Sequence, residues 1–339
     1  MCNKNNFLAA IEGNDHEKVP VWFMRQAGRY LPKYHELRKN RSIMEITLDP
    51  NTVEEISYLP VNEIGVDASI IFSDILLPVE TMGFKLHYED GKGPMISNSV
   101  LSGQNSKIMD YEPAADPYLP VEAVRLFKSR HPSTPLIGFC GGPVTVASYL
   151  IKGESDGDLA ATRSLMYRKP DVYRRILRHV TDAMILLLKS QISAGCDVVQ
   201  IFDSWAGSMS RDQFQQYREN FLSDIFTELG SSRSIYFSTS SWHLVDQLKE
   251  LGATFLSMDW RSDLSSLIGV VRSGTGLQGN LDPVLSQSGS QACETETRRI
   301  VDSMLDQDGY IFNLGHGVLP GTDPGTLRDI VNIVHSYSR

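Results

Sequence analysis

The sequence predicts an α/β fold, a single-domain (β/α)8 TIM barrel with an insertion after its second strand. Short apolar runs rich in β-branched residues alternate with longer segments of helical periodicity along the whole chain. Eight such runs occur, and the length of 339 residues exceeds a typical barrel of about 250 by what one insertion can supply. A doubly wound sheet is the alternative that the same alternation allows.

The predicted strands are apolar runs bounded by Gly, Asp or Pro, a pattern typical of parallel strands buried on both faces. In chain order they are Val19–Met24, Ala68–Phe72, Leu136–Cys140, Val198–Phe202, Ser234–Ser238, Phe255–Met258, Leu277–Gly279 and Tyr310–Asn313. The insertion is Ser73–Pro135, with a hairpin pattern around Tyr88-Glu89-Asp90-Gly91. We expect residues 1–339 to form one catalytic barrel domain.

The predicted helices have clear apolar stripes. Asp171–Ala194 is the longest, and a glycine that is suited to a C-cap follows it. Phe214–Ile225 and Leu244–Leu251 predict two shorter helices. The last helix is expected to begin with Asp323 as N-cap and Pro324 in its first position.

Composition narrows the class of protein. The net charge is −9 with a pI near 5.4, which argues against general nucleic-acid binding because such binding needs a basic surface. No apolar run approaches the roughly 18 residues of a membrane span, and the N-terminus lacks the apolar core of a signal peptide. The four cysteines are far apart, which indicates reduced thiols. We expect a cytoplasmic protein with no nucleic-acid or membrane partner.

Unusual polar residues follow the predicted strands, where barrel enzymes carry their chemistry. They are Arg25 and Arg29 after the first strand, Asp74 after the second, Tyr149 beyond the third, Ser204 after the fourth and His316 after the eighth. This distribution played no part in placing the strands. It therefore favours a site at the carboxyl ends of a barrel.

Arg25 and Arg29 form the first candidate pair. A solvated surface pair at helical spacing is the ordinary interpretation of such arginines. Here the pair follows a buried strand directly, and Gly28 and Pro32 interrupt any regular surface helix. Two guanidinium groups beside free backbone N–H groups favour a clamp for carboxylates.

The other candidates have structural alternatives as well. Asp74 lies between two apolar runs, which suits either a helix N-cap or an acceptor at the floor of a pocket. Tyr149 could be a core tyrosine, and Ser204 a turn residue. His316 lies between two glycines, which bring the backbone close to a ligand that the imidazole could hydrogen-bond, although it could also satisfy a turn.

The sequence gives little support to a cofactor or metal site. Gly274–Gly279 matches the dinucleotide pattern G-x-G-x-x-G, but the residues before it suggest a helix, and a turn follows it. The sequence contains no H-E-x-x-H, G-x-S-x-G or P-loop pattern, and its histidines lack metal-ligand spacing. We therefore expect no metal and no nucleotide site.

Together these residues closely resemble the uroporphyrinogen decarboxylase family. The matching segments are Pro20–Pro32, Phe72–Leu76, Gly138–Thr145 with Tyr149 and Gly153, Phe202–Gly207, Asp259–Arg261, Gly279–Pro283 and Asn313–Gly317. The resemblance runs in order from about residue 7 to 335. The chain departs from the family pattern at Gly142, Val144 and Lys152, and Ser238–Trp242 lacks a typical glycine, which leaves the shape of those loops open.

The resemblance implies a homodimeric barrel without cofactor or metal. It implies a carboxy-lyase that converts the four acetates of uroporphyrinogen III to methyl groups, giving coproporphyrinogen III in haem and other tetrapyrrole biosynthesis. Its implied site residues are Asp74 as the group that stabilises the transition state, Arg25 and Arg29 as catalytic and carboxylate-binding groups, the backbone of Gln26, Ala27 and Gly28, and Tyr149, Ser204 and His316 as substrate-binding groups.

Two other functions remain open at this stage. One is a related methyltransferase acting on corrinoid or thiol substrates, but such enzymes hold zinc with a His-x-Cys element that this sequence lacks. The other is a tetrapyrrole-binding barrel without catalytic activity.

Overall fold

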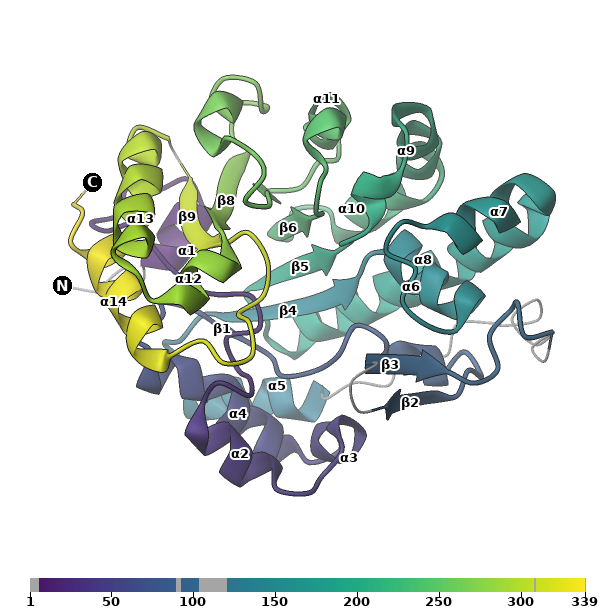
Figure 1. Cartoon of the computed structure of the whole chain (residues 1–339), viewed down its shortest axis with the longest axis horizontal. Coiled ribbons are helices and arrows are strands. Elements are labelled where there is room, and N and C mark those ends of the chain that lie inside the picture. The colour runs from purple at the N-terminus through teal and green to yellow at the C-terminus, as the bar shows by residue number, and fades with distance from the viewer. Residues whose placement is uncertain (1–5, 90–92, 104–120, 308, 339) are drawn as a thin grey trace.

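The computed structural model describes residues 6–89, 93–103, 121–307 and 309–338. A curled sheet of parallel strands lies at its centre, with helices around it (Figure 1). The seven strands of this sheet are β1 (Ser69–Ile70), β4 (Leu136–Gly141), β5 (Val198–Phe202), β6 (Ser234–Phe237), β7 (Phe255–Ser257), β8 (Gly276–Leu281) and β9 (Tyr310–Leu314).

The order of the strands confirms the barrel class. Neighbours run β1-β4-β5-β6-β7-β8-β9, in chain order and all parallel. A doubly wound sheet would reverse its order at a switch point, and this sheet has none among the described strands. Gly276 and Gly279 of the G-x-G-x-x-G match lie in β8, so these two glycines belong to a barrel strand.

The segment Val19–Met24 lies where a first barrel strand was predicted, but the prediction that it forms a regular strand is wrong. Only Val21 forms a bridge, parallel to Phe312 of β9. On its other side Val21 N–H donates to the carboxylate of Asp67 at 2.7 Å, and its carbonyl accepts from Asp67 N at 2.8 Å. Pro20 has no N–H to continue a ladder. This segment therefore closes the barrel between β9 and β1 without being a regular strand.

The interior of the barrel holds a layer of buried polar side chains. Trp22 Nε1 donates to Gln278 Oε1 at 2.9 Å. Gln278 Nε2 in turn donates to Ser257 Oγ at 2.9 Å and to Gln200 Oε1 at 3.2 Å. These bonds connect the closing segment with β8, β7 and β5. They satisfy the buried amide of Gln278, whereas Gln200 Nε2 is buried without a hydrogen-bond partner among the described residues.

The insertion contains the predicted hairpin. Strands β2 (Leu86–Glu89) and β3 (Gly93–Ile96) pair antiparallel, while residues 90–92 of the predicted turn and residues 104–120 lie outside the described part. A 3₁₀ turn, Leu77–Glu80, precedes the hairpin. The hairpin lies near α6 (Pro143–Lys152), the helix that follows β4 (Figure 1), and Ile96 N donates to Gly153 O at 2.7 Å.

The long predicted helix is α8 (Pro170–Ala194), which Gly195 ends with a φ of 121°. The stripe over Phe214–Ile225 spans α9 (Arg211–Tyr217), a π turn and α10 (Ser223–Leu229). The helix predicted over Leu244–Leu251 is shorter, since α11 is only Val245–Leu248 after a 3₁₀ turn. The remaining helices are α1 (Asn6–Ile11), α2 (Pro32–Arg38), α3 (Ile43–Thr47), α4 (Pro50–Glu63), α5 (Val121–Arg130), α6 (Pro143–Lys152), α7 (Ala160–Arg168), α12 (Pro283–Ser288), α13 (Gln291–Met304) and α14 (Pro324–His335).

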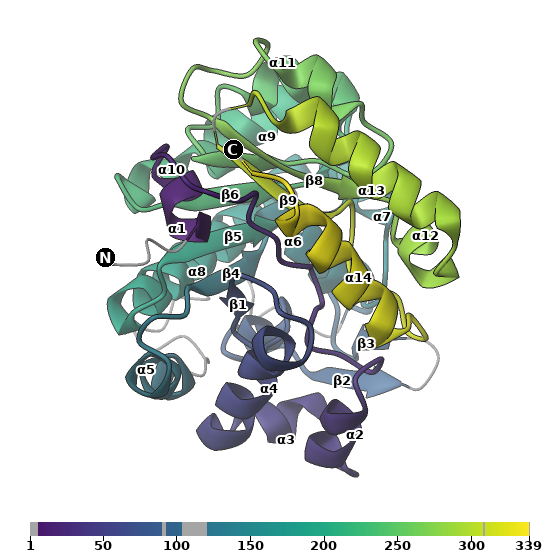
Figure 2. The same cartoon turned by 90° about the vertical axis from the view of Figure 1, so that its left-hand side faces the viewer.

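The predicted start of the last helix is confirmed. The carboxylate of Asp323 accepts from Thr326 N at 3.2 Å, and Pro324 is the first residue of α14. Helices α13 and α14 lie side by side on the outside of the barrel (Figure 2). No helix in the described part of the chain has both the length and the apolar character needed to cross a bilayer.

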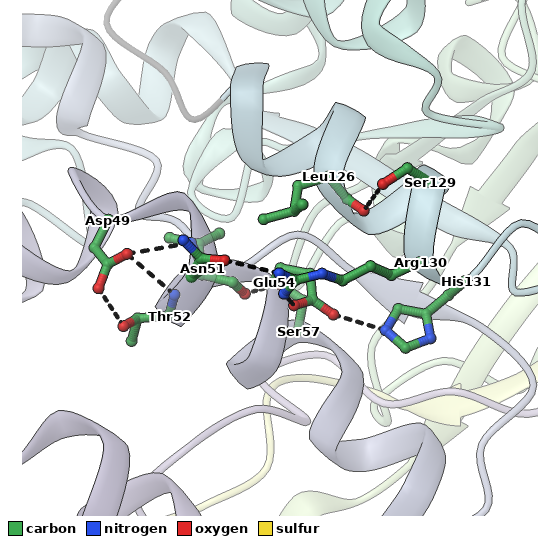
Figure 3. Close-up of polar contacts among 10 residues, drawn as sticks. Asp49, Asn51, Thr52, Glu54, Ser57, Leu126, Ser129, Arg130 and His131 are labelled. Carbon is green, nitrogen blue, oxygen red and sulfur yellow. Dashed lines mark hydrogen bonds and ion pairs between the residues drawn. The ribbon is translucent and has the colours of Figure 1, made fainter.

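Helices α4 and α5 are held together by a buried carboxylate. Glu54 accepts from Arg130 Nη1 at 2.5 Å and lies 2.6 Å from His131 Nε2 (Figure 3). Arg130 Nη2 also donates to Asn51 Oδ1 at 2.9 Å. The His131 ring stacks on Tyr58 with centroids 3.6 Å apart. This network satisfies a charge that burial would otherwise make costly.

Replacing Asp67 should destabilise the fold measurably. Its carboxylate is 19% exposed and contacts both Val21 N and His335 Nε2, the latter at 2.8 Å. We expect Asp67→Ala to lower the free energy of unfolding by about 1–3 kcal/mol, because buried donors lose their acceptor. Urea unfolding measures this.

The matched control is Asp171→Ala. That side chain is 92% exposed and pairs with Arg174 on the surface at 3.2 Å. Its loss should change the free energy of unfolding by less than about 0.5 kcal/mol. Equal effects of the two substitutions would show that Asp67 has no special part in closing the barrel.

Candidate active site

The structure brings four predicted residues, Arg25, Asp74, Tyr149 and His316, into one electrostatic neighbourhood. The charge of Arg25 lowers the pKa of each of the other three groups. These residues come from the closing segment, the loop after β1, helix α6 and the loop after β9. These residues therefore lie close enough to interact at the carboxyl ends of the barrel strands, and their role as a site stays a prediction.

The backbone around Arg25 is fixed from both sides. Met24 N donates to the side chain of Asn313 at 3.1 Å, and Gln26 N donates to Phe23 O at 3.0 Å. Arg25 has a φ of 58°, a left-handed conformation that is uncommon for a residue with a side chain. Its stem lies over Gly317, where an added Cβ would be 2.3 Å from Arg25 Cδ. Glycine at 317 therefore makes room for this arginine.

Gln26 anchors the arginine loop from inside the protein. Its buried side chain accepts from Phe23 N at 3.1 Å and donates to Ala68 O at 3.0 Å. Its carbonyl accepts from Tyr30 OH at 2.5 Å. The backbone groups of Gln26 are thus already partnered, whereas Ala27 and Gly28 are half-buried beside them.

Arg29 lies further out on the same loop. Its side chain is exposed, its carbonyl lies 2.6 Å from His35 Nε2, and its charge lowers the pKa of Tyr34. The four-residue neighbourhood around Arg25 therefore does not include Arg29 in this structure.

Asp74 acts as a cap, which is one of the two interpretations that its sequence context allows, and its role as an acceptor at the floor of a pocket stays a prediction. Its Oδ1 accepts from Leu76 N at 2.8 Å, which caps the turn into the insertion. Burial raises its pKa, while the Leu76 N–H and the nearby Arg25 charge oppose that rise. Gly141 at the end of β4 lets this loop approach, since an added Cβ would be 3.1 Å from Ile75 Cβ. The carboxylate is held in place with capacity for further donors.

Tyr88 of β2 is a site residue that the sequence did not reveal. Burial raises the pKa of its phenol, and the charge of Asp74 raises it further. The hydroxyl is buried beside Asp74 but has no hydrogen bond of regular geometry in the described structure. Only the hairpin pattern was visible in the sequence, and it gives no sign of which face meets Asp74.

Tyr149 is held by aromatic stacking. Its ring lies 4.8 Å from that of Trp205, at an interplanar angle of 29°. Burial and the Asp74 charge raise the pKa of Tyr149 to about 12, so its hydroxyl stays protonated at neutral pH. The phenol can therefore donate to a ligand carboxylate.

A buried aspartate, Asp203, fixes the loop that carries Ser204. It accepts from Thr145 Oγ1 at 2.8 Å, Tyr217 OH at 2.6 Å and Tyr236 OH at 3.1 Å. Burial raises its pKa and these donors lower it. The sequence gave Asp203 no role, because its partners lie on three elements far apart in the chain.

Ser204 itself lies just beyond this network. Its carbonyl accepts from Thr239 N at 3.2 Å and from Thr239 Oγ1 at 2.5 Å. Both contacts are made by its backbone, so they join the loop after β5 to the loop after β6 and do not test the turn that its residue type suggested. Its neighbour Trp205 connects the same loop to Tyr149.

His316 is neutral at physiological pH. Burial lowers its pKa to about 4, with further lowering by Arg25 and Arg261 and an opposing effect of Asp259. Its ring meets Phe237 edge-on with centroids 5.9 Å apart. A neutral imidazole offers one donor and one acceptor.

A pocket of about 620 Å³ lies apart from these residues. Its lining includes Trp260 and Asn280 near β7 and β8, and Glu296 and Arg299 of α13. None of the predicted site residues lines it. The convergence of charged and polar groups around Arg25 is therefore the stronger candidate for the chemistry.

The cysteines that the structure describes are free thiols, as the sequence analysis expected. Cys140, Cys196 and Cys293 are buried free thiols. Within residues 6–89, 93–103, 121–307 and 309–338, no cluster of three His, Cys, Asp or Glu side chains is placed to hold a metal ion.

The fold and site define a parallel barrel protein with an arginine, a half-buried carboxylate and tyrosines gathered at the carboxyl ends of its strands. Residues 3–337 match the family model described as uroporphyrinogen decarboxylase (URO-D). The chain belongs to the uroporphyrinogen decarboxylase family.

Relatives of similar length support that assignment. The uroporphyrinogen decarboxylase of Thermoplasma acidophilum is 40% identical over 333 residues, covering 98% of this chain and 99% of its own. That of Nocardia farcinica is 40% identical over 336 residues, covering 97% and 95%. Among solved structures, a methyltransferase from Methanosarcina mazei has the same fold, with a TM-score of 0.78, 20% identity and coverage of 98% and 97%.

Adding one methyl group at Gly317 should displace Arg25. We expect Gly317→Ala to keep the fold but to lower kcat/KM by about 10-fold or more, since sub-ångström placement of binding groups governs rate. The control is Gly157→Ala, where the new Cβ would meet its nearest neighbour at an ordinary 3.6 Å. Equal activity of the two variants would contradict the packing of Arg25 on Gly317.

The imidazole of His316 should not titrate near pH 6.5 in the folded protein. NMR titration should place its pKa near 4. Arg25→Gln should raise that pKa, because a nearby positive charge disfavours the imidazolium. The unfolded chain takes up this proton first, so the contribution of His316 to stability should be lost as pH falls from about 6.5 to about 4. A parent pKa above 6 would contradict the burial of the ring beside Arg25.

Proposed function

We propose that this protein is a carboxy-lyase that removes carbon dioxide from the four acetate side chains of uroporphyrinogen III, giving coproporphyrinogen III. The observation that carries the proposal is the half-buried carboxylate of Asp74, on which the charge of Arg25 acts, in the loop after β1. Membership of the family supports the choice of substrate. The whole chain would act as one barrel domain in haem and tetrapyrrole biosynthesis.

Decarboxylation requires a place for the electrons of the breaking C–C bond. The pyrrole ring can serve, because protonation of the ring carbon next to the one that bears the acetate creates an iminium that remains conjugated with the acetate-bearing carbon. Loss of carbon dioxide returns those electrons to the ring, and a proton on the exocyclic methylene completes the methyl group. The ring proton is released as aromaticity is restored, so no oxidant, reductant or separate electron sink is consumed.

Asp74 would stabilise the cationic intermediate. Its carboxylate would accept hydrogen bonds from the pyrrole N–H groups, and its negative charge would face the developing positive charge. Burial raises the pKa of Asp74, but N–H donors from the macrocycle would favour its ionised form, as the Leu76 N–H already does. Substrate binding would thus prepare the group for its task.

The remaining site residues would bind the substrate carboxylates. Arg25 and Arg29 offer planar guanidinium groups, with the backbone of Gln26, Ala27 and Gly28 shaping the loop between them. The reacting ring would be oriented by hydrogen bonds from three further side chains, Tyr149, Ser204 and His316.

We further propose that the enzyme works without cofactor or metal, as a cytoplasmic homodimer. A related methyltransferase is the weaker candidate, because the sequence has no His-x-Cys element for zinc. The methyltransferase from Methanosarcina mazei shares the fold at 20% identity, which is too remote to indicate shared chemistry.

Turnover of anaerobically prepared uroporphyrinogen III tests the proposal directly. Chromatography of the oxidised products should show loss of four carboxylates to give coproporphyrin. Methyl transfer to a thiol, or binding of the substrate without turnover, would favour the methyltransferase or the non-catalytic barrel.

Asp74→Asn should fold and bind substrate but lose about 10²–10³-fold in kcat, as expected when one preorganised charge is removed. The matched control is Asp158→Asn, since Asp158 Oδ1 also accepts from the N–H two residues on, Ala160 N at 3.1 Å, but in an exposed loop. Steady-state kinetics compares them. Activity of Asp74→Asn within a few-fold of the control would refute the assigned role.

Arg25→Lys and Arg29→Lys should both raise KM. Lysine keeps the positive charge but loses the two-pronged contact with a carboxylate, so we expect roughly a tenfold effect for each. If Arg29 were only a surface residue, its substitution would leave kinetics unchanged while that of Arg25 would not.

A further inference from the structure

We infer that Arg261 is a third carboxylate-binding arginine of this site, a specificity-determining residue that receives a peripheral carboxylate across the barrel mouth from Asp74. The chemical class of its ligand is a carboxylate on a large polyanion. The identity of that polyanion as a porphyrinogen rests on the proposed function.

The strand order places Arg261 opposite Asp74. Asp74 follows β1, and Arg261 follows β7. Between β1 and β7 stand β4, β5 and β6 on one side, and β8, β9 and the closing segment on the other. A macrocycle whose centre meets Asp74 would extend its rim toward the far wall of the mouth.

The turn that carries Arg261 is packed directly against the His316 loop. Gly315 approaches it so closely that an added Cβ would be 2.3 Å from Trp260 N. Asn280 Nδ2 of β8 donates to Asp259 O at 2.9 Å and to Ser262 O at 2.8 Å. Arg261 therefore belongs to the same rim as His316, and its charge acts on that imidazole in the same direction as the charge of Arg25.

The guanidinium of Arg261 is held in place before any ligand arrives. Its Nη1 donates to Asp259 Oδ2 at 2.6 Å, and Asp259 is 1% exposed. Its central carbon lies 3.9 Å from the centroid of the Trp260 ring. The ion pair and the aromatic stacking restrict the Arg261 side chain before binding. Less side-chain conformational entropy is therefore lost when a ligand binds.

The same group retains the capacity to bind. The Arg261 side chain is 51% exposed, and the bond to Asp259 is the one hydrogen bond that its guanidinium makes to a described residue. Nε and Nη2 can therefore still donate to a carboxylate. Asp259 Oδ2 also accepts from Ser240 N at 2.9 Å, so the negative charge is anchored beneath the guanidinium.

Kinetics of Arg261→Gln on uroporphyrinogen III test the inference. We expect KM to rise by roughly tenfold with kcat nearly unchanged, as for loss of one hydrogen bond to a charged group that contributes equally to ground and transition states. Arg261→Lys should give a smaller rise in KM, since it keeps the charge without the planar group.

The matched control is Arg233→Gln. Arg233 is 40% exposed and paired with Glu12, but it precedes β6 and so lies at the amino end of the barrel. Thermal unfolding of all variants separates an effect on folding from an effect on binding. If Arg261→Gln has a lowered melting temperature, the kinetics of Arg261→Lys test the inference.

Three outcomes are distinguishable. A raised KM for both Arg261 variants, with Arg233→Gln like the parent, supports the inference. Unchanged KM, or a fall in kcat alone, overturns it while parent turnover keeps the proposed function intact. A parent that does not decarboxylate uroporphyrinogen III refutes the proposed function, and the assignment of Arg261 to that substrate fails with it.

Discussion

The barrel closes through the backbone of Val21, and the candidate site depends on that closure. Val21 bridges to Phe312 of β9 and exchanges hydrogen bonds with Asp67 before β1. The chain then turns at Arg25, whose stem packs against Gly317 in the loop that follows β9 and whose charge acts on Asp74 in the loop that follows β1. The irregular closing segment thus positions the charge of Arg25, which lowers the pKa of three other site groups.

Electrostatics inside this mouth differ from those of the whole chain. The protein has a net charge of −9, yet burial, Arg25 and Arg261 all lower the pKa of His316, and Arg25 favours the ionised form of Asp74. Burial has the opposite effect on Asp74, whose pKa is raised overall. A polyanionic ligand would therefore meet local cationic groups at its rim and a carboxylate near its N–H groups.

The sequence predicted the barrel because periodicity, caps and strand ends are local signals. It placed Asp74 and His316 correctly at strand ends, and the N-cap of α14. It could not reveal Tyr88, whose approach to Asp74 depends on how the hairpin folds back, nor Asp203, whose partners are distant in the chain. It also expected a regular first strand, where Pro20 and the carboxylate of Asp67 replace part of a ladder.

The central claim is that Asp74 meets the pyrrole N–H groups of a macrocycle bound at the carboxyl ends of the strands. A crystal structure of the protein with coproporphyrinogen III, grown without oxygen, tests it most directly. The pyrrole nitrogens should lie within about 3.2 Å of the Asp74 carboxylate oxygens. A macrocycle seated in the pocket of Trp260 and Arg299, with Asp74 free of it, would contradict the claim.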